Sequence, residues 1–364
     1  MNLKDIDALL FATRAKLDYQ KYMTPINYAE ENERFLRLYG EGVVYNPQYE
    51  YEKFSPQKDD LDAVRLCVDE TATAEGGIAL LLNRSAVSLL KEMKLYSLIG
   101  DNEAFTPLSN SIFGRPSETL REEALGILTK KAEEDCDTKF PALVLASFLK
   151  ERIAEYGFSW DIQLSPKMAS RVSVEPEQKT VYINAAKTFT ERDITRLAVH
   201  EIDTHVLRCE NGERQGYHLL SSGTVGSLIH EEGLAIFSEW KNGVQDRFAE
   251  KLYAARYLTC LDIDLPFYEL FDRLISLGVD KEQALYVVAR IKRGLSDTSL
   301  PGGFIKDYVY FGGFYEVRDY LARHPEKTPY LYYGSVALGD LEVLDADIKA
   351  ALDNGSIILP IEKQ

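Results

Sequence analysis

Two histidines and a glutamate stand close together in the segment AVHEIDTHVLR, residues 198–208. Imidazole nitrogens are common zinc ligands, and a neighbouring carboxylate can take a proton from water. In the zinc-peptidase motif H-E-x-x-H the histidines are four residues apart, on one face of a helix. His200 and His205 are five apart, which on a regular helix turns the two rings about 140° from each other. The segment therefore indicates metal-assisted hydrolysis only if the helix is locally irregular.

A single widened turn of the π type absorbs one extra residue, and such turns are frequent at functional sites. Asp203 and Thr204 are poor helix formers whose side chains can bond to nearby backbone. We therefore predict a bulge between Glu201 and His205, at Asp203–Thr204. In the alternative interpretation, Glu201 is paired with an arginine and His205 is a hydrogen-bonded core histidine.

A second acidic stretch, LIHEEGLAIFSEW at residues 228–240, could supply a third metal ligand from another helix. Glu231 and Glu232 are the competing carboxylates. His230 is expected to be a neighbour of the site, because three protein ligands already complete a catalytic zinc shell. Glu239 lies two turns beyond Glu232 and could orient a ligand histidine, although a surface acid is an equally good interpretation.

Hydrophobic periodicity indicates which elements position these residues. Up to residue 157 the pattern is mostly helical, and residues 158–165 then alternate as a strand does. A hairpin should pair Val172 and Val174 with Val181 and Ile183. Beyond it the helical period returns, so we expect an α+β fold, mainly helical, with a small central antiparallel sheet next to the metal-binding helix. The expected division is an N-terminal portion, 1–157, and a metallopeptidase portion, 158–364. The helices expected before the sheet cover 4–23, the residues after Asn27, 118–134 and a segment that ends at Gly157.

The metal-binding helix has a recognisable start and stop. Thr190 is a suitable N-cap, with Asp193 as its capping-box partner, and Asn211-Gly212 is a plausible end. The helix is therefore expected over residues 191–210.

Composition limits the class of protein. The chain has 364 residues, 45% of them hydrophobic, which is ample for a buried core. Its formal charge of −16 disfavours a nucleic acid or an anionic membrane as partner. No stretch approaches the roughly 18 apolar residues of a membrane span, and the N-terminus lacks the apolar centre of a signal peptide. The chain has four cysteines without C-x-x-C spacing: Cys67, Cys136, Cys209 and Cys260. A disulfide framework is therefore not expected, and a cytoplasmic location is.

Several motifs in order resemble the microtubule-associated tyrosine carboxypeptidase family, whose bacterial members carry a QEGLA motif. They are TPINYAEENERFL, HEIDTHVLR, NGERQGYHLLSSG, EEGLAIFSE and RIKRGLSDTSLPGGFIKDYVYFGG. The resemblance implies a thermolysin-like metallopeptidase that binds one zinc ion through His200, His205 and Glu232, with Glu201 as general base. It leaves Glu231 as a neighbouring acid. At Asp203 the chain departs from the glycine expected in this family.

A carboxypeptidase also needs groups that hold the substrate. Tyr310 is our candidate to stabilise the oxyanion of the tetrahedral intermediate. A fixed cation must bind the terminal carboxylate, and the basic group at 290–293 and 306 suggests Arg293 and Lys306. Arg171, on the hairpin, is a further candidate, because an edge strand can bind an extended peptide. The alternative for the basic group is a solvated helix end that its dipole stabilises. The glycine pairs at 302–303 and 312–313 are expected to permit tight packing or loop motion.

The sequence therefore predicts a zinc-dependent carboxypeptidase that removes C-terminal residues, tyrosine or another large residue, from a peptide or protein. The negative charge of the chain argues against long-range attraction to the acidic tails of tubulin, so a different C-terminus is expected. An endo- or aminopeptidase would share every metal residue. A regulatory protein with a structural zinc site is the other alternative, although a structural site has no use for the base Glu201.

Overall fold

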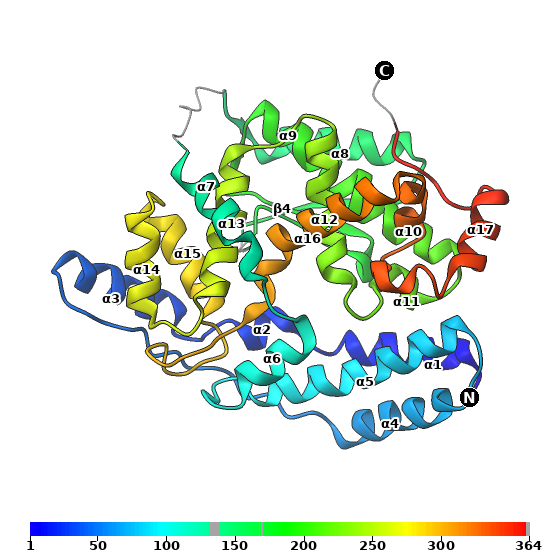
Figure 1. The fold of residues 1–364 in the computed structure, drawn as a ribbon, viewed down its shortest axis with the longest axis horizontal. Coiled ribbons are helices and arrows are strands. Elements are labelled where there is room, and N and C mark those ends of the chain that lie inside the picture. Colours follow the sequence, from blue (N-terminus) through cyan, green and yellow to red (C-terminus); the bar gives the residue numbers. More distant parts are fainter. Residues whose placement is uncertain (131–137, 167, 169, 362–364) are drawn as a thin grey trace. The chain divides into compact units, whose positions relative to one another are not determined.

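The computed structural model describes residues 1–130, 138–166, 168 and 170–361. It divides into two compact units, each built from two segments of the chain (Figure 1). Unit 1 comprises Met1–Lys131 and Phe248–Gly312, and unit 2 comprises Ala132–Arg247 and Gly313–Gln364. The expected boundary at residue 157 thus falls inside unit 2. The change of period there marks a change of secondary structure, whereas membership of a unit depends on contacts distant in sequence.

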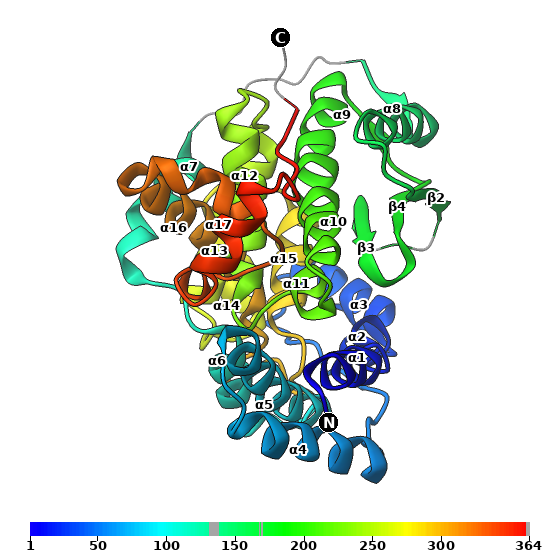
Figure 2. The same ribbon diagram turned by 90° about the vertical axis from the view of Figure 1, so that its right-hand side faces the viewer.

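Unit 1 is helical in its described part. Its core includes Met23, Leu95, Ile99, Phe105 and Phe304. Helices α1, α4 and α5 pack side by side (Figure 2). The elements are α1 Leu3–Arg14, α2 Tyr19–Met23, α3 Tyr28–Gly40, α4 Lys58–Ala72, α5 Gly77–Ser97, α6 Phe105–Phe113, η1 Glu118–Leu120, α7 Arg121–Thr129, α13 Arg247–Leu261, α14 Phe267–Ser276, α15 Lys281–Ile291, η4 Ile305–Tyr308 and the start of α16 Val309–Arg323.

Two helices of unit 1 differ from their sequence predictions. The helix expected over 4–23 is divided into α1 and α2, because Asp18 caps a new helix by accepting a hydrogen bond from the Lys21 amide at 2.9 Å. The helix expected over 118–134 begins as a 3-10 turn and continues as α7 to Thr129. Residues 131–134 and Cys136 lie outside the described residues.

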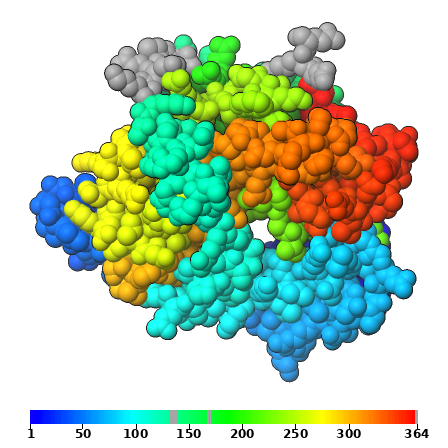
Figure 3. All heavy atoms as spheres, viewed as in Figure 1, coloured from blue at the N-terminus to red at the C-terminus, as the bar shows by residue number. Residues whose placement is uncertain are grey.

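Unit 2 combines helices with two small sheets. In the space-filling view, α16 and the C-terminal segment that carries α17 are next to each other at the surface, orange to red in Figure 3. The elements are β1 Phe140–Pro141, α8 Ala142–Glu155, β2 Asp161–Ser165, β3 Val172–Glu175, η2 Pro176–Gln178, β4 Thr180–Asn184, β5 Thr188–Phe189, α9 Glu191–Leu197, η3 Ala198–Val206, α10 Leu207–Arg214, α11 His218–Ser222, α12 Ser227–Lys241, the rest of α16, η5 Pro325–Tyr332, η6 Leu338–Asp340 and α17 Asp345–Asp353.

The main sheet has the strand order β2-β4-β3. The predicted hairpin is confirmed, with Val172 opposite Ile183 and Val174 opposite Val181. The prediction of a purely antiparallel sheet is wrong, because β2 runs parallel to β4. Alternation reveals a buried face but not the direction of a neighbouring strand. A second sheet pairs β1 with β5 in antiparallel orientation.

The core of unit 2 lies between the sheet, α8 and the helix that carries His200 and His205. It includes Leu149 of α8, Val181 of β4 and Ile202 of η3. Figure 2 shows α9 to α10 as one long column beside β3 and β4, and η3 contacts β3, α8 and α12. The predicted end of α8 is confirmed, since Gly157 follows it with a φ of 70°. Among the described residues, no helix is long and apolar enough to cross a membrane.

Candidate metal centre

The helix that carries both histidines begins as the sequence predicts. The Thr190 hydroxyl accepts a hydrogen bond from the Asp193 amide at 3.0 Å, and the Asp193 carboxylate accepts one from the Thr190 amide at 3.0 Å. This capping box satisfies two amides that the first turn would otherwise leave unpaired. Arg171 fixes Asp193 further through two hydrogen bonds of 2.8 and 2.7 Å.

The predicted π-type irregularity is confirmed, and it covers more residues than expected. Nine residues, Ala198–Val206, form a π-helix between α9 and α10. The Thr204 hydroxyl donates to the carbonyl of Val199, five residues earlier, at 3.0 Å, so this side chain bonds with the spacing of the widened turns. The rings of His200 and His205 consequently lie together, with centres 4.9 Å apart and planes 74° apart.

Three residues of the first motif come together on η3. His200, Glu201 and His205 each offer one ligand atom, and all of these atoms lie within 4.8 Å of one another. His200 and Glu201 are buried, and His205 is nearly so. An apolar core position for Glu201 would be costly without a partner or a function.

Glu232, on α12, faces both histidines. Its Oε2 lies 3.6 Å from Nε2 of His200 and 3.8 Å from Nε2 of His205. Zinc bonds of about 2.0–2.1 Å in tetrahedral geometry separate ligand atoms by roughly 3.3 Å. The two distances from Oε2 of Glu232 are close to that separation, so the donor set is of a kind that could hold a zinc ion.

The other nitrogen of each ring has its own carboxylate. Nδ1 of His200 lies 2.7 Å from Oε1 of Glu239, and Nδ1 of His205 lies 2.9 Å from Oε1 of Glu231. An arginine backs each acid, since Arg196 donates to Glu239 at 3.0 Å and Arg208 donates to Glu231. Both rings are therefore oriented with Nε2 towards Glu232, as carboxylates orient ligand histidines in metal sites.

These contacts shift the ionisation of the site. Burial lowers the pKa of His200, but hydrogen bonds to Glu232 and Glu239 outweigh burial and raise it to about 10. Burial raises the pKa of Glu231, but Arg208 and His205 outweigh burial and hold it below its usual value. Glu231 is thus an ionised partner of His205, whereas Glu232 is the carboxylate that both Nε2 atoms face.

His230 is engaged away from this group. Its Nδ1 accepts a hydrogen bond from the Leu338 amide at 3.3 Å, and its Nε2 lies 3.3 Å from the carboxylate of Glu316. The expectation of a neighbour outside the ligand set fits these partners.

Asp203, at the position where glycine was expected, joins the π-helix to α8. Arg152 donates two hydrogen bonds to it, at 2.7 and 2.9 Å, and the Tyr156 hydroxyl donates a third at 2.9 Å. The Ile361 amide donates to that same hydroxyl at 3.1 Å. The ion pair between Arg152 and Asp203 thus stabilises the π-helix at the position where glycine was expected.

The predicted stop at Asn211-Gly212 is wrong, because the helix continues to Arg214. The Asn211 amide donates to the carbonyls of Tyr332 and Ile358 at 2.7 and 2.8 Å. At Gly212 a Cβ would lie 2.1 Å from the Leu220 carbonyl oxygen. Both residues therefore make tertiary contacts, and Gly216, with a φ of 76°, follows the helix end.

The glycine of the E-E-G-L-A motif has a packing role. A Cβ at Gly233 would lie 2.3 Å from the backbone of Gly313, and a Cβ at Gly313 would lie 2.0 Å from the carbonyl oxygen of Ile229. Helices α12 and α16 thus touch directly beside Glu232. Tight packing, one of the two roles expected for the glycine pairs, is confirmed at Gly313.

The other predicted site residues lie apart from this group or belong to unit 1. Arg171 is paired with Asp193, as described above. Tyr310, Arg293 and Lys306 belong to unit 1, where Tyr310 stacks on Tyr253 with ring centres 5.3 Å apart. Sequence reasoning missed the roles of Arg196 and Arg208. Their signal was helical spacing, four residues before His200 and three after His205.

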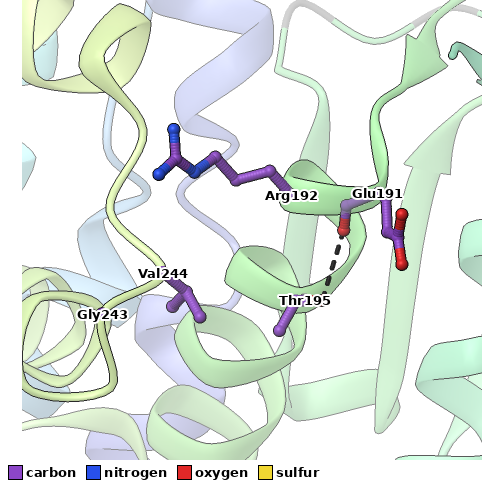
Figure 4. A pocket seen from close by; sticks show the side chains of 5 residues that line it. All are labelled: Glu191, Arg192, Thr195, Gly243 and Val244. Carbon is purple, nitrogen blue, oxygen red and sulfur yellow. Dashed lines mark hydrogen bonds between the residues drawn. The ribbon is translucent and has the colours of Figure 1, made fainter. Parts of the chain in front are cut away.

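A separate hollow of about 290 Å³ opens at the start of α9. Figure 4 shows its lining, in which the Thr195 hydroxyl donates to the Glu191 carbonyl at 3.2 Å. The other lining residues are Arg192, Gly243 and Val244. None of the predicted site residues lines it, so this hollow is distinct from the candidate metal centre.

Comparison with known proteins matches most of the chain, including both histidines and the E-E-G-L-A motif, to one family. Residues 33–355 match the profile of a family described as "Microtubule-associated tyrosine carboxypeptidase". A Rattus norvegicus protein named microtubule-associated tyrosine carboxypeptidase 1 is 26% identical over 340 residues, which cover 88% of this chain and 61% of the rat protein. The Homo sapiens protein of the same name is 33% identical over 167 residues, 43% of this chain and 34% of the human protein.

Proposed function

Because the chain belongs to the microtubule-associated tyrosine carboxypeptidase family, we propose that it is a zinc-dependent carboxypeptidase. It hydrolyses the last peptide bond of a peptide or protein and releases the C-terminal residue, with tyrosine or another large residue as the candidates. The single observation that carries the proposal is that Glu232 faces Nε2 of both His200 and His205.

The proposed ligands are His200, His205 and Glu232. When bound, zinc would act as a Lewis acid towards the scissile carbonyl and would make a water molecule more acidic. Glu201 takes the proton from that water and returns it to the leaving amine. A carboxylate oxygen of Glu201 lies within 4.8 Å of a ring nitrogen of each histidine, which suits a base beside the reacting water.

Glu231 and Glu239 are proposed as positioning residues. An ionised carboxylate accepts hydrogen bonds and cannot donate them. Each acid therefore holds the proton of its histidine ring on Nδ1 and leaves Nε2 for the metal. Arg208 and Arg196 donate hydrogen bonds that hold these two acids in place.

The thermolysin-like architecture is proposed for unit 2. It is supported by the small sheet whose β3 contacts η3, and by α12, which carries Glu232 against the same helix. The oxyanion role of Tyr310, the substrate-binding roles of Arg293, Lys306 and Arg171, and a cytoplasmic location stay predictions. The substrate is proposed to be a C-terminus other than an acidic tubulin tail, since the chain itself carries a formal charge of −16.

Metal analysis and peptide cleavage test the proposal together. We expect the purified protein to retain about one zinc ion per chain. A peptide with a free C-terminus should lose its last residue, whereas the same peptide with an amidated C-terminus should not, as mass spectrometry of the products would reveal. Internal or N-terminal cleavage would indicate an endo- or aminopeptidase. Zinc without cleavage of any peptide in a C-terminal-residue library would indicate a structural metal site.

A further inference from the structure

The last described residues of the chain lie against the two helices next to the π-helix. Residues 354–361 follow α17 without forming a helix or a strand, and Figure 2 shows them in red beside the column of α9 to α10. Side chains of α8 and α10 bind their backbone, and all of these elements belong to unit 2. Because α10 continues η3 directly and α8 contacts it, this C-terminal segment touches both neighbours of the part that carries the two histidines.

Asn211 of α10 binds the segment at Ile358. Its side-chain oxygen accepts a hydrogen bond from the Ile358 amide at 2.9 Å, and its side-chain nitrogen donates to the Ile358 carbonyl at 2.8 Å. One buried side chain thus satisfies both backbone groups of one residue, as a neighbouring strand would. This contact fixes the segment to the helix that follows η3.

Arg152 and Tyr156 of α8 bind the segment at Ile361. The Ile361 amide donates to the Tyr156 hydroxyl at 3.1 Å, and Arg152 donates to the Ile361 carbonyl at 3.2 Å. The side chains of Leu359 and Ile361 are 45% and 39% exposed, so their burial contributes little to this attachment. Hydrogen bonds to the backbone therefore hold this end of the segment in place.

The same two side chains of α8 hold Asp203 inside η3. The Tyr156 hydroxyl donates to Asp203 at 2.9 Å, and Arg152 donates two further bonds, at 2.7 and 2.9 Å. Because a hydroxyl carries one proton, accepting a bond from the Ile361 amide leaves that proton for Asp203. Bonds linked in this way strengthen one another in a buried place, and Asp203 is buried. A continuous chain of hydrogen bonds thus joins the C-terminal segment to the π-helix.

Asp203 stands in the part of η3 that brings the two histidines together. It lies between His200 and His205 in the sequence. Widened turns are rare, and a regular helix over the same residues would turn the two rings about 140° apart. Contacts that keep Asp203 in place therefore favour the widened turns, and with them the distance of 4.9 Å between the ring centres.

We propose that residues 358–361 form a strap that sets the placement of the two histidines. Tyr156, Arg152 and Asp203 are the positioning residues through which the strap acts. The strap follows from hydrogen bonds within the chain, and only its consequence for zinc affinity rests on the proposed function. A segment that merely added to the stability of unit 2 would affect all parts of the unit alike.

Shortened chains test the strap. A chain that ends at Leu359 loses both hydrogen bonds of Ile361 and keeps those of Ile358, whereas a chain that ends at Ile361 keeps all four bonds and is the matched control. In metal-free protein that ends at Leu359, we expect hydrogen exchange over 198–206 to be at least about tenfold faster than in the control, with β4 unchanged. Mass spectrometry would measure this exchange. Zinc affinity, from competition with a chelator, should fall by at least about tenfold.

Two substitutions show whether the effect passes through the proposed residues. Tyr156→Phe removes only the hydroxyl and should speed exchange over 198–206 in the full chain. Asp203→Gly breaks the connection and introduces the residue expected in this family. In the Asp203→Gly background, the two shortened chains should have equal exchange over 198–206 and equal zinc affinity, because the strap no longer reaches the π-helix.

Three results would overturn the strap. They are equal exchange over 198–206 in the chains that end at Leu359 and Ile361, an increase that extends equally to β4, and an effect of chain length that persists with Asp203→Gly. If every chain failed to bind zinc, the proposed function would be refuted. The exchange data, taken without metal, would still decide on the strap.

Discussion

Nδ1 of His200 lies 2.7 Å from the carboxylate of Glu239, a residue 39 positions further along the chain. Glu239 is itself 1% exposed and accepts a hydrogen bond from Arg196. This contact decides which nitrogen of His200 is available to a metal, because the acid can only bind a protonated Nδ1.

We expect Glu239→Gln to lower zinc affinity by about 10- to 100-fold, since an amide no longer stabilises the ring in its ligating orientation. Competition with a chromophoric chelator would measure the change. The control is Glu213→Gln, which alters an acid of α10 that is paired with Lys179. This variant should bind zinc normally. Equal zinc affinity in the two variants would contradict the positioning role.

Glu231 and Glu232 should respond differently to the same substitution. Glu232→Gln removes a proposed ligand, so we expect a loss of zinc affinity greater than about 100-fold. Glu231→Gln removes the charge that orients His205 and pairs with Arg208, but it removes no proposed ligand and should cost about 10- to 100-fold. The same chelator competition compares the two variants. A larger loss of zinc affinity in Glu231→Gln would make Glu231 the ligand and Glu232 the positioning residue.

Glu201→Gln should separate metal binding from catalysis. We expect turnover of a free-acid peptide to fall by about 10²- to 10⁴-fold, because the general base is lost, while zinc content stays near that of the unmodified protein. Metal analysis and a cleavage assay on one preparation provide both quantities. A variant that retained turnover would exclude Glu201 as the base.

The protonation of His200 predicts opposite pH trends for zinc affinity and for stability without zinc. Its pKa is about 10 in the folded chain, where Glu232 and Glu239 outweigh burial, and about 6.5 when unfolded. Without zinc, the protonated ring therefore contributes stability that is complete below about pH 6.5 and is lost as pH rises through about 10.

Zinc must displace that proton, so we expect its affinity to rise by up to about tenfold per pH unit below about pH 10, the pKa of His200 in the folded chain, and to level off above it. Calorimetry in two buffers of different ionisation enthalpy would count the proton released, and thermal denaturation of metal-stripped protein would follow the stability. A pH-independent zinc affinity would contradict the charge state inferred for His200.

The contact between α12 and α16 predicts a sharp difference between two glycines. Gly233→Ala would place a Cβ 2.3 Å from the Gly313 backbone, so we expect it to destabilise the fold by about 1–3 kcal/mol or more. Gly339→Ala is the control, since nothing lies within 4 Å of its Cβ position. Urea denaturation compares the free energies of unfolding, and equal values would mean that the helices separate at little cost.

The sequence by itself determined features that depend on neighbouring residues. The capping box of Thr190 and Asp193, the hairpin register at Val172 and Val174, and the irregular helix between His200 and His205 all follow from spacing over a few positions. Such interactions can be predicted from nearby residues, because their geometry is that of the local backbone.

Only the tertiary structure decided which distant groups meet. Adjacent glutamates differ by about 100° around a helix, so the packing of α12 on η3 selected Glu232 to face both rings and Glu231 to hold His205. Contacts with Tyr332, Ile358 and Leu220 give Asn211 and Gly212 tertiary roles within the helix instead of a helix end, and pairing with β4 set the direction of β2. Within unit 1, the fold brought Arg256 to Asp307, 51 positions away. Burial and hydrogen bonding between separate segments determine these choices, and no local pattern carries that information.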